Sequence, residues 1–236
     1  MNNEYHHALK DLYSYGTTYS PRGFKTKELL NYTLTLHNPK ERISTLNPLH
    51  TRIDYAMAEL EWYLSGSNRI TDLPEKYQRI WKQFSDDGVH CNSAYGQYIF
   101  PRQWKWTIET LKQDNDTRQA LININQPYHK SSITKDFPCC IAMQFFIRDS
   151  ELDMIVNFRS NDINLGWKND IFTMSALQEI LAYKINVPLG TFHIVSNSLH
   201  IYERDFKLAE EVLNKPLIEN VEYNIPVKQL VKKYKL

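Results

Sequence analysis

The chain has 236 residues, of which 42% are hydrophobic and 23% are charged, and its formal net charge at pH 7 is +1. This length and composition are typical of a globular protein that buries a substantial core. The near-zero charge gives no global attraction to nucleic acid or to an anionic membrane, and no apolar run is long enough to span a bilayer. We therefore expect a cytoplasmic protein without a nucleic-acid or membrane partner.

Glycine and cysteine usage excludes several kinds of site. Only 7 glycines occur, and the sequence contains neither GxGxxG nor GxxxxGK[ST], so we expect no glycine-rich phosphate loop. Cys91, Cys139 and Cys140 are too few for a disulfide framework and suit a reducing compartment. They also lack metal-ligand spacing with the 8 histidines, so we expect no metal site.

The first predicted element in chain order is a helix over residues 52–65. We expect Thr51 to cap its start and Gly66 to end it. Glu59 is adjacent to the apolar stripe of this helix, and burial in a cleft would raise its pKa toward acid–base duty. An ordinary exposed glutamate is the alternative interpretation, and it is the one that we expect for Glu61. The stripe itself consists of Ile53, Ala56, Met57, Leu60 and Leu64.

The middle and end of the chain predict a sheet. Short apolar runs rich in β-branched and aromatic residues predict strands over 120–126, 140–148, 152–160 and 190–202, with a hairpin at "DSE" and a helix over 171–186. Strands and helices interleave without a regular βαβ rhythm, and no repeat or linker divides the chain. We therefore expect one α+β domain over residues 1–236, with a mixed sheet flanked by helices. The basic tail is expected to be a partly mobile surface segment.

Residues with chemical potential stand at the predicted strand ends. Cys139 follows Pro138 directly before a strand, and a guanidinium from Arg159 in the paired strand would lower the thiol pKa. A small buried side chain is the alternative interpretation of the cysteine. His200 and Tyr202 share one strand face, as a site pair or as a core aromatic pair. Groups that would form a phosphate site if the fold gathers them, and surface residues otherwise, are Arg22, Arg118, Arg159 and Ser160.

The order and spacing of seven motifs add a resemblance. They are "ELEWYLSGS" (59–67), "IWKQF" (80–84), "NSAYGQ" (92–97), "DTRQA" (116–120), "PCCIAMQF" (138–145), "RSNDINLGWKND" (159–170) and "SLHIY" (198–202). From about Arg22 to Tyr202 they resemble the thymidylate synthase superfamily, specifically its bacteriophage deoxycytidylate (dCMP) hydroxymethylase branch. The resemblance implies a thymidylate synthase-like α/β two-layer sandwich, 5,10-methylenetetrahydrofolate as co-substrate, and a homodimer in the host cytoplasm if the chain is phage-encoded.

The same resemblance implies roles for single residues. Cys139 resembles the nucleophile that adds to carbon 6 of the pyrimidine, Glu59 the glutamate that orders water, and Tyr95 the tyrosine that assists removal of the carbon 5 proton. The remaining roles are phosphate binding by Arg22, Arg159 and Ser160, phosphate binding across the dimer by Arg118, sugar binding by His200 and Tyr202, and folate binding by Trp81, Asp162 and Gly166.

Asp170 predicts the base. A synthase that acts on uracil has asparagine at this position, because an amide donates to oxygen 4 and accepts from the N–H at position 3. Cytosine reverses both demands, and a carboxylate accepts from its amino group and favours protonation of ring nitrogen 3 during attack. Since a mismatch leaves buried groups unpaired, discrimination of ~10⁴-fold is within reach. The sequence therefore predicts cytosine.

We accordingly predict conversion of dCMP, 5,10-methylenetetrahydrofolate and water to 5-hydroxymethyl-dCMP and tetrahydrofolate. The alternatives are a CMP hydroxymethylase, a methyl-forming dCMP or dUMP synthase, a non-catalytic pyrimidine-nucleotide binder, and a cysteine hydrolase using Cys139 and His200. The chain departs from the synthase pattern at Cys140, where a histidine is usual, and at Gln119, where a second phosphate-binding arginine is usual. The synthase-like ending that closes over the folate is also absent from "YKL".

Overall fold

A seven-stranded mixed sheet forms the centre of the computed structural model, which describes residues 1–130 and 134–236. The strand order is β1-β2-β7-β5-β4-β3, and β6 pairs with β7. Strand β7 is parallel to β5 and β6, and the other pairs are antiparallel. The strands are β1 Thr17–Tyr19, β2 Thr26–Leu36, β3 Leu121–Asn123, β4 Cys140–Arg148, β5 Glu151–Phe158, β6 Asn161–Asp162 and β7 Leu189–Tyr202.

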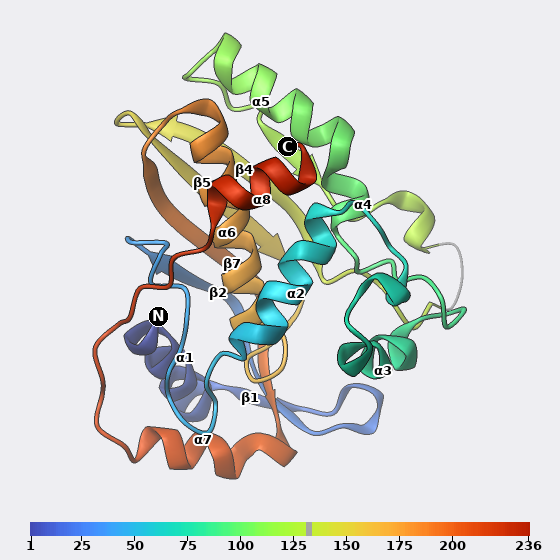
Figure 1. Cartoon of the computed structure of the whole chain (residues 1–236). Coiled ribbons are helices and arrows are strands. Elements are labelled where there is room, and N and C mark those ends of the chain that lie inside the picture. The colour runs from blue at the N-terminus through green and yellow to red at the C-terminus, as the bar shows by residue number, and fades with distance from the viewer. Residues whose placement is uncertain (131–133) are drawn as a thin grey trace.

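Helices cover one face of this sheet, with α2, α6 and α8 in front of it in Figure 1. Helix α6 contacts both the sheet and α2, and it is therefore buried on nearly all sides. This layering confirms the expected α+β architecture. The helices are α1 Asn2–Tyr15, α2 Ile53–Leu64, α3 Glu75–Phe84, α4 Gly96–Tyr98, α5 Trp104–Gln113, α6 Trp167–Ile185, α7 Phe206–Leu213 and α8 Val227–Tyr234. Within residues 1–130 and 134–236, no helix combines the length and apolarity needed to cross a bilayer.

The hairpin between β4 and β5 is confirmed. Arg148 pairs with Glu151, and the two loop residues Asp149 and Ser150 have φ of 49° and 65°. Two positive φ values mark the turn whose twist matches that of the flanking strands. This hairpin sets the register that brings the start of β4 beside the end of β5, where Cys139 and Arg159 lie.

The sheet changes its buried face at one level across neighbouring strands. In β7 the buried side chains are those of Ile194 and Ser196 and then, after a shift of one residue, Leu199 and Ile201. The same shift occurs between Phe158 and Asn161, which link β5 to β6, and between Cys140 and Met143 in β4. In a regular strand every second side chain points to the same face of the sheet. The shift of one residue therefore moves the buried positions of each strand to the other set of alternate residues at this level. Polar side chains of β6 and β7, namely Asn161 and Ser196, are therefore buried at this level.

Several sequence predictions of elements need correction. Helix α2 matches residues 52–65 and Gly66 ends it with φ of 69°, but the Thr51 hydroxyl accepts a hydrogen bond from the Ser44 N–H (2.9 Å) and caps nothing. Strand β3 is shorter than predicted, because the N–H groups of Ile124 and Asn125 both donate to one carbonyl and end the ladder. Helix α6 begins at Trp167, ahead of the expected residue 171.

The C-terminal tail and Glu61 differ from their predictions because they contact each other, although α8 lies at the surface and the Glu61 side chain remains 36% exposed. The tail forms α8, which buries Leu230 against the core. Its Lys233 and Tyr234 both donate hydrogen bonds to the Glu61 carboxylate on α2. The apolar residues of α8 recur at helical spacing, but the surrounding lysines obscured this pattern in the sequence.

Candidate active site

The thiol of Cys139 lies beside the guanidinium of Arg159. The backbone N–H of Arg159 donates to the Cys139 carbonyl (2.9 Å), and its Nη2 lies 3.5 Å from the cysteine Sγ. The guanidinium also donates to the carbonyls of Phe137 (2.7 Å) and Pro138 (3.0 Å) and stacks over the Phe137 ring. The pairing of the two strands at this point is as predicted. The arginine thus braces the loop that presents the cysteine.

The predicted direction of the Cys139 pKa shift is wrong. Burial raises the pKa of the thiol, and although Arg159 lowers it as expected, Asp170 and Asp136 raise it further. The net pKa of Cys139 therefore lies above its ordinary value. The site therefore holds a neutral thiol at rest, and a nucleophilic role for this sulfur would require its proton to leave during the attack.

Glu59 is 4% exposed, and its Oε1 accepts a hydrogen bond from the Tyr55 hydroxyl (3.0 Å). The Tyr55 oxygen in turn accepts a hydrogen bond from the Trp81 indole (3.1 Å). Burial raises the pKa of Glu59 to about 7, although hydrogen bonds from Tyr55 and Tyr63 act in the opposite direction. The expected burial and raised pKa are thus confirmed. A carboxyl group with this pKa exchanges protons near neutrality, which suits acid–base work.

Replacing Glu59 with glutamine is expected to make the protein more stable at alkaline pH. The folded protein binds the Glu59 proton more tightly than the unfolded chain does, because the pKa rises from 4.5 to about 7. This contribution to stability is fully present below pH 4.5 and is lost as pH rises through about 7. Relative to the wild type, the free energy of unfolding of Glu59→Gln should therefore rise by roughly 3 kcal/mol across that window. Urea titrations at several pH values measure it.

Glu61→Gln is the matched control on the same helix. Burial is the largest single effect on Glu61 and raises its pKa, but the hydrogen bonds from Lys233 and Tyr234 and the charge of Lys233 together outweigh burial and lower the pKa. Its stabilising contribution is therefore present above its unfolded-state pKa and lost in acid, which is the opposite sign. If the free energy of unfolding of the two variants depended on pH in the same way, the raised pKa assigned to Glu59 would be contradicted.

Tyr95 and Asp170 complete the interior of the site. The Tyr95 hydroxyl accepts a hydrogen bond from the Cys140 N–H (3.2 Å), and burial, Cys139 and Asp170 all raise the pKa of the phenol. Asp170 lies in the first turn of α6, and burial and the Glu59 carboxylate raise its pKa well above the ordinary value. These couplings show that helices α2 and α6 and the start of β4 bring the four predicted catalytic residues together.

Two further hydrogen bonds fix Asp170. The Asn161 Nδ2 donates to Asp170 Oδ2 (2.9 Å), and the Ser196 hydroxyl donates to Asn161 Oδ1 (2.8 Å). Sequence reasoning missed Asn161, Ser196 and Tyr55. Tyr55 had a usable signal, since it lies one helical turn before Glu59. Ser196 had none, because it stands 35 residues from its partner on another strand.

The predicted phosphate ligands are only partly gathered. Ser160 follows Arg159 at the end of β5, and Arg22 is exposed in a short turn at Pro21–Gly23 with φ of 54°, close enough to lower the pKa of Cys139. Arg118 is not brought to them. Its carbonyl accepts a hydrogen bond from Gln144 (2.7 Å), five residues along β4 from Cys139, or ~17 Å at the rise of a strand.

The predicted sugar and folate ligands lie in two places, around strands β6 and β7 and on helix α3. His200 and Tyr202 lie on one face of β7 with ring centroids 5.3 Å apart, as predicted, and Asp162 pairs with His200 in the β6–β7 register. A Cβ added to Gly166 would lie 3.4 Å from Asp170 Oδ2. Trp81 lies apart from these on α3, beside Tyr55 and Trp62.

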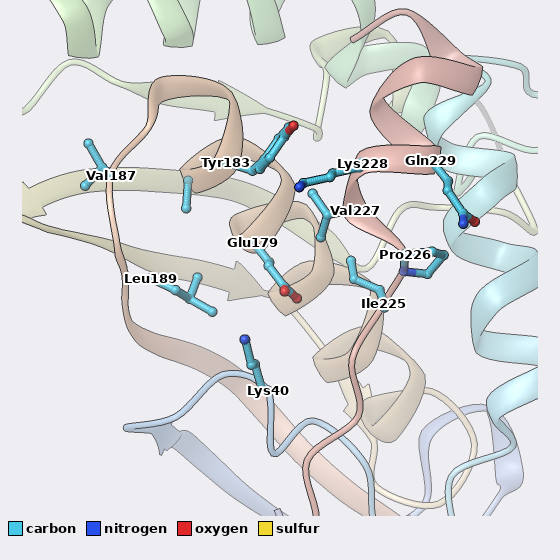
Figure 2. Close-up of a pocket in the computed structure, with 11 residues that line it drawn as sticks. Lys40, Glu179, Tyr183, Val187, Leu189, Ile225, Pro226, Val227, Lys228 and Gln229 are labelled. Carbon is cyan, nitrogen blue, oxygen red and sulfur yellow. The ribbon is translucent and has the colours of Figure 1, made fainter.

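A separate cavity of about 470 Å³ lies between the second half of α6 and the start of α8 (Figure 2). Its walls include Glu179, Tyr183 and Lys228, and none of the predicted site residues lines it. The buried Arg42 forms an ion pair with Glu179 (2.5 Å), so a cation in the protein interior neutralises the Glu179 carboxylate at the cavity wall. The described residues contain no group of three or more His, Cys, Asp or Glu side chains placed to hold a metal ion.

Comparisons with known proteins confirm the resemblance and the fold. A family model described as thymidylate synthase matches residues 3–236. The chain is 30% identical over 229 residues to the deoxyuridylate hydroxymethyltransferase of Bacillus phage SP01, covering 88% of this chain and 59% of that protein. It is 31% identical over 177 residues to the deoxycytidylate 5-hydroxymethyltransferase of Enterobacteria phage T2, covering 68% and 72%.

The solved structure of thermostable thymidylate synthase A from Bacillus subtilis matches the fold with a TM-score of 0.78 at 20% identity. The match covers 93% of this chain and 86% of that one. The expected mixed sheet flanked by helices is therefore confirmed. By contrast, the chain spans about three fifths of the length of the SP01 relative.

Proposed function

Because the chain belongs to the thymidylate synthase family, we propose that it converts dCMP, 5,10-methylenetetrahydrofolate and water to 5-hydroxymethyl-dCMP and tetrahydrofolate. The observation that carries the cytosine preference is the carboxyl group of Asp170, which lies inside the site with Glu59, Tyr95 and Cys139 as neighbours. The proposed catalytic domain comprises residues 1–236, because one hydrophobic cluster contains most of the buried apolar side chains of the described residues.

The nucleotide is proposed to bind along the level where the sheet changes face. Its phosphate would replace the backbone carbonyls that the Arg159 guanidinium now contacts, with Ser160 and Arg22 as further donors. His200 and Tyr202 would bind the sugar hydroxyl. This placement puts the base over Cys139 and directs its amino edge to Asp170 at the start of α6.

The proposed reaction then depends on proton transfers at Cys139, Tyr95 and Glu59. The Cys139 sulfur adds to carbon 6 as its proton leaves, which makes carbon 5 nucleophilic toward the methylene that the folate supplies. Removal of the carbon 5 proton, which is assigned to Tyr95 through ordered water, releases tetrahydrofolate and leaves an exocyclic methylene on carbon 5. Water adds to this methylene, and the Cys139 sulfur leaves carbon 6, which restores the ring double bond and the free thiol. Glu59, with its pKa of about 7, is proposed to position the water whose oxygen ends in the hydroxymethyl group.

The residues proposed to hold the folate offer suitable groups. Asp162 Oδ2 is buried without a hydrogen-bond partner among the described residues, and its nearest cation is Arg204 Nη2 at 3.7 Å. A buried carboxylate oxygen that accepts no hydrogen bond suits the ring N–H donors of a pterin. The partly exposed Trp81 presents an aromatic face, and Gly166 leaves room beside Asp170.

We also propose a homodimer that brings Arg118 to the partner's phosphate site. Arg118 is exposed and, along β4, too far from Cys139 of its own chain to share that site. The sheet face turned away from the helices carries Phe146, Ile155 and Val195, which remain partly exposed in the single chain. A second copy packed on that face would bury them and carry its Arg118 across.

Mixing two inactive variants is expected to restore activity if Arg118 acts across the dimer. In a heterodimer of Arg118→Ala and Cys139→Ala, one of the two sites has both residues intact, so the mixture should turn over substrate although neither variant does alone. A mixture of Arg159→Ala and Cys139→Ala should stay inactive, because both residues belong to the same chain's site. Equal inactivity of the two mixtures would contradict the shared site.

The mass of the nucleotide product tests the proposed function. The protein is incubated with 5,10-methylenetetrahydrofolate and dCMP, dUMP or CMP in parallel. Gain of CH₂O on dCMP is the expected result. Gain on dUMP alone would move the function to that of the SP01 relative, gain on CMP alone to a ribonucleotide hydroxymethylase, and gain of CH₂ to a methyl-forming synthase. The absence of any product would favour a nucleotide binder.

A further inference from the structure

The two oxygens of Asp170 have different surroundings. Oδ2 accepts the hydrogen bond from Asn161 (2.9 Å), and Asn161 is held from behind by the Ser196 hydroxyl (2.8 Å). Asn161 and Ser196 are 2% and 0% exposed, so water does not compete for these bonds. With the amide N–H turned to the carboxyl group and the amide oxygen occupied by Ser196, Oδ2 is maintained as an acceptor.

We propose that Asn161, held by Ser196, is the positioning residue that makes the two oxygens of Asp170 unequal and so sets the preference for cytosine over uracil. The inference rests on the proposed function, because it concerns the residue that reads the base. A proton on Asp170 would reside on Oδ1, since Oδ2 already receives an N–H. By donating to Oδ2, Asn161 also favours the ionised form of Asp170, in which Oδ1 is an acceptor for the amino group of cytosine.

The position of the proton matters because a neutral carboxyl group can bind either cytosine or uracil. It presents one donor and one acceptor, and exchanging them between the two oxygens matches either base edge. Cytosine offers an amino donor at carbon 4 and an acceptor at nitrogen 3, whereas uracil offers an acceptor and a donor at the same places. An ionised carboxylate presents only acceptors and keeps the match to the amino group of cytosine, whereas a proton on Oδ1 would supply the donor that matches oxygen 4 of uracil.

The charges around Asp170 make the hydrogen bond from Asn161 necessary. Burial and the Glu59 carboxylate favour the neutral form, and the hydrogen bond from Asn161 opposes them. Among the described residues, the titratable groups coupled most strongly to Asp170 are all acids. They are Glu59, Tyr55 and Tyr63 from α2, Tyr95 ahead of α4, and Cys139 and Cys140 at the start of β4. The neutral amide of Asn161 therefore acts in place of a positive charge.

Two variants and one control test the proposal. Asn161→Leu removes the N–H at similar volume, and Ser196→Ala releases the amide from behind. Ser175→Ala removes another buried hydroxyl, whose bonds go to the carbonyls of Ile171 and Phe172 within α6. The kcat/KM values for dCMP and dUMP are measured as a function of pH, with far-UV circular dichroism to verify folding.

Asn161→Leu is expected to lower the dCMP-to-dUMP ratio of kcat/KM about 10-fold, the scale of one hydrogen bond to a charged group. The pH profile for dCMP should move to higher pH, because the pKa of Asp170 rises when its donor is lost. Ser196→Ala should act in the same direction with a smaller effect, and Ser175→Ala should change neither quantity. A packing defect alone would lower kcat/KM for both nucleotides by the same factor and would leave the pH profile unchanged.

An unchanged ratio and an unchanged profile in folded Asn161→Leu would overturn the inference, and Ser196→Ala decides it if the first variant does not fold. A wild-type protein that turns over neither nucleotide would overturn the proposed function instead. In that case the dissociation constants of dCMP and dUMP replace kcat/KM. A shifted ratio of those constants in the variants supports the inference, and an unshifted ratio overturns it.

Discussion

Asp170→Asn is expected to move the preference of the protein from dCMP to dUMP, with a change of up to ~10⁴-fold in the ratio of their kcat/KM values. The oxygen of the introduced amide would accept the N–H of Asn161 as Asp170 Oδ2 does (2.9 Å). Its NH₂ group would then face the substrate, where it matches oxygen 4 of uracil and opposes the amino group of cytosine. Product mass for both nucleotides, supplied at equal concentration, measures the switch.

Asp162→Asn is the matched control for this switch. Asp162 adjoins Asn161 in β6, but its Oδ1 accepts hydrogen bonds from the backbone N–H groups of Asn164 and Leu165. Its loss should lower the rate with both nucleotides by the same factor, through the folate, and leave their ratio unchanged. If the ratio were as high in Asp170→Asn as in the wild type, Asp170 would not read the base.

Cys139→Ser is expected to lower turnover by at least ~10⁴-fold, the scale on which enzymes lose activity with their nucleophile. A hydroxyl is a much weaker nucleophile than a thiol at the same distance from Arg159, and burial disfavours its ionisation further. Nucleotide binding should persist, because Arg159 and Ser160 are unchanged. Steady-state turnover and the dissociation constant of dCMP separate the two effects.

Cys140→Ala controls for the loss of a neighbouring sulfur. Cys140 is fully buried, and its side chain belongs to the hydrophobic core, so the site loses no polar contact with it. Its variant should therefore retain turnover close to that of the wild type, with at most a modest loss of stability. Loss of turnover in both variants alike would indicate disruption of the start of β4 and not the removal of a nucleophile.

The short-range features of the fold were accessible from the sequence. Helix α2 and strands β4, β5 and β7 lie within one or two residues of their predicted bounds, because apolar spacing and turn residues act over a few positions. The neighbouring positions of Cys139 and Arg159 followed from the hairpin alone. Strand β2, in contrast, was not predicted, although it pairs along most of its length with β7. Its alternating polar residues became a strand through that pairing.

Residue types and their spacing by themselves determined the family, and they carry the proposals of a nucleophile and of a carboxyl group that reads the base, since these depend on local identity. Only the tertiary structure decided the state of these groups. Burial by distant segments raises the pKa of Cys139 despite Arg159 and that of Glu59 to about 7, and it brings Asn161 to Ser196 across 35 residues. Desolvation and hydrogen bonding are sums over everything that packs around a group, and no stretch of sequence contains that sum.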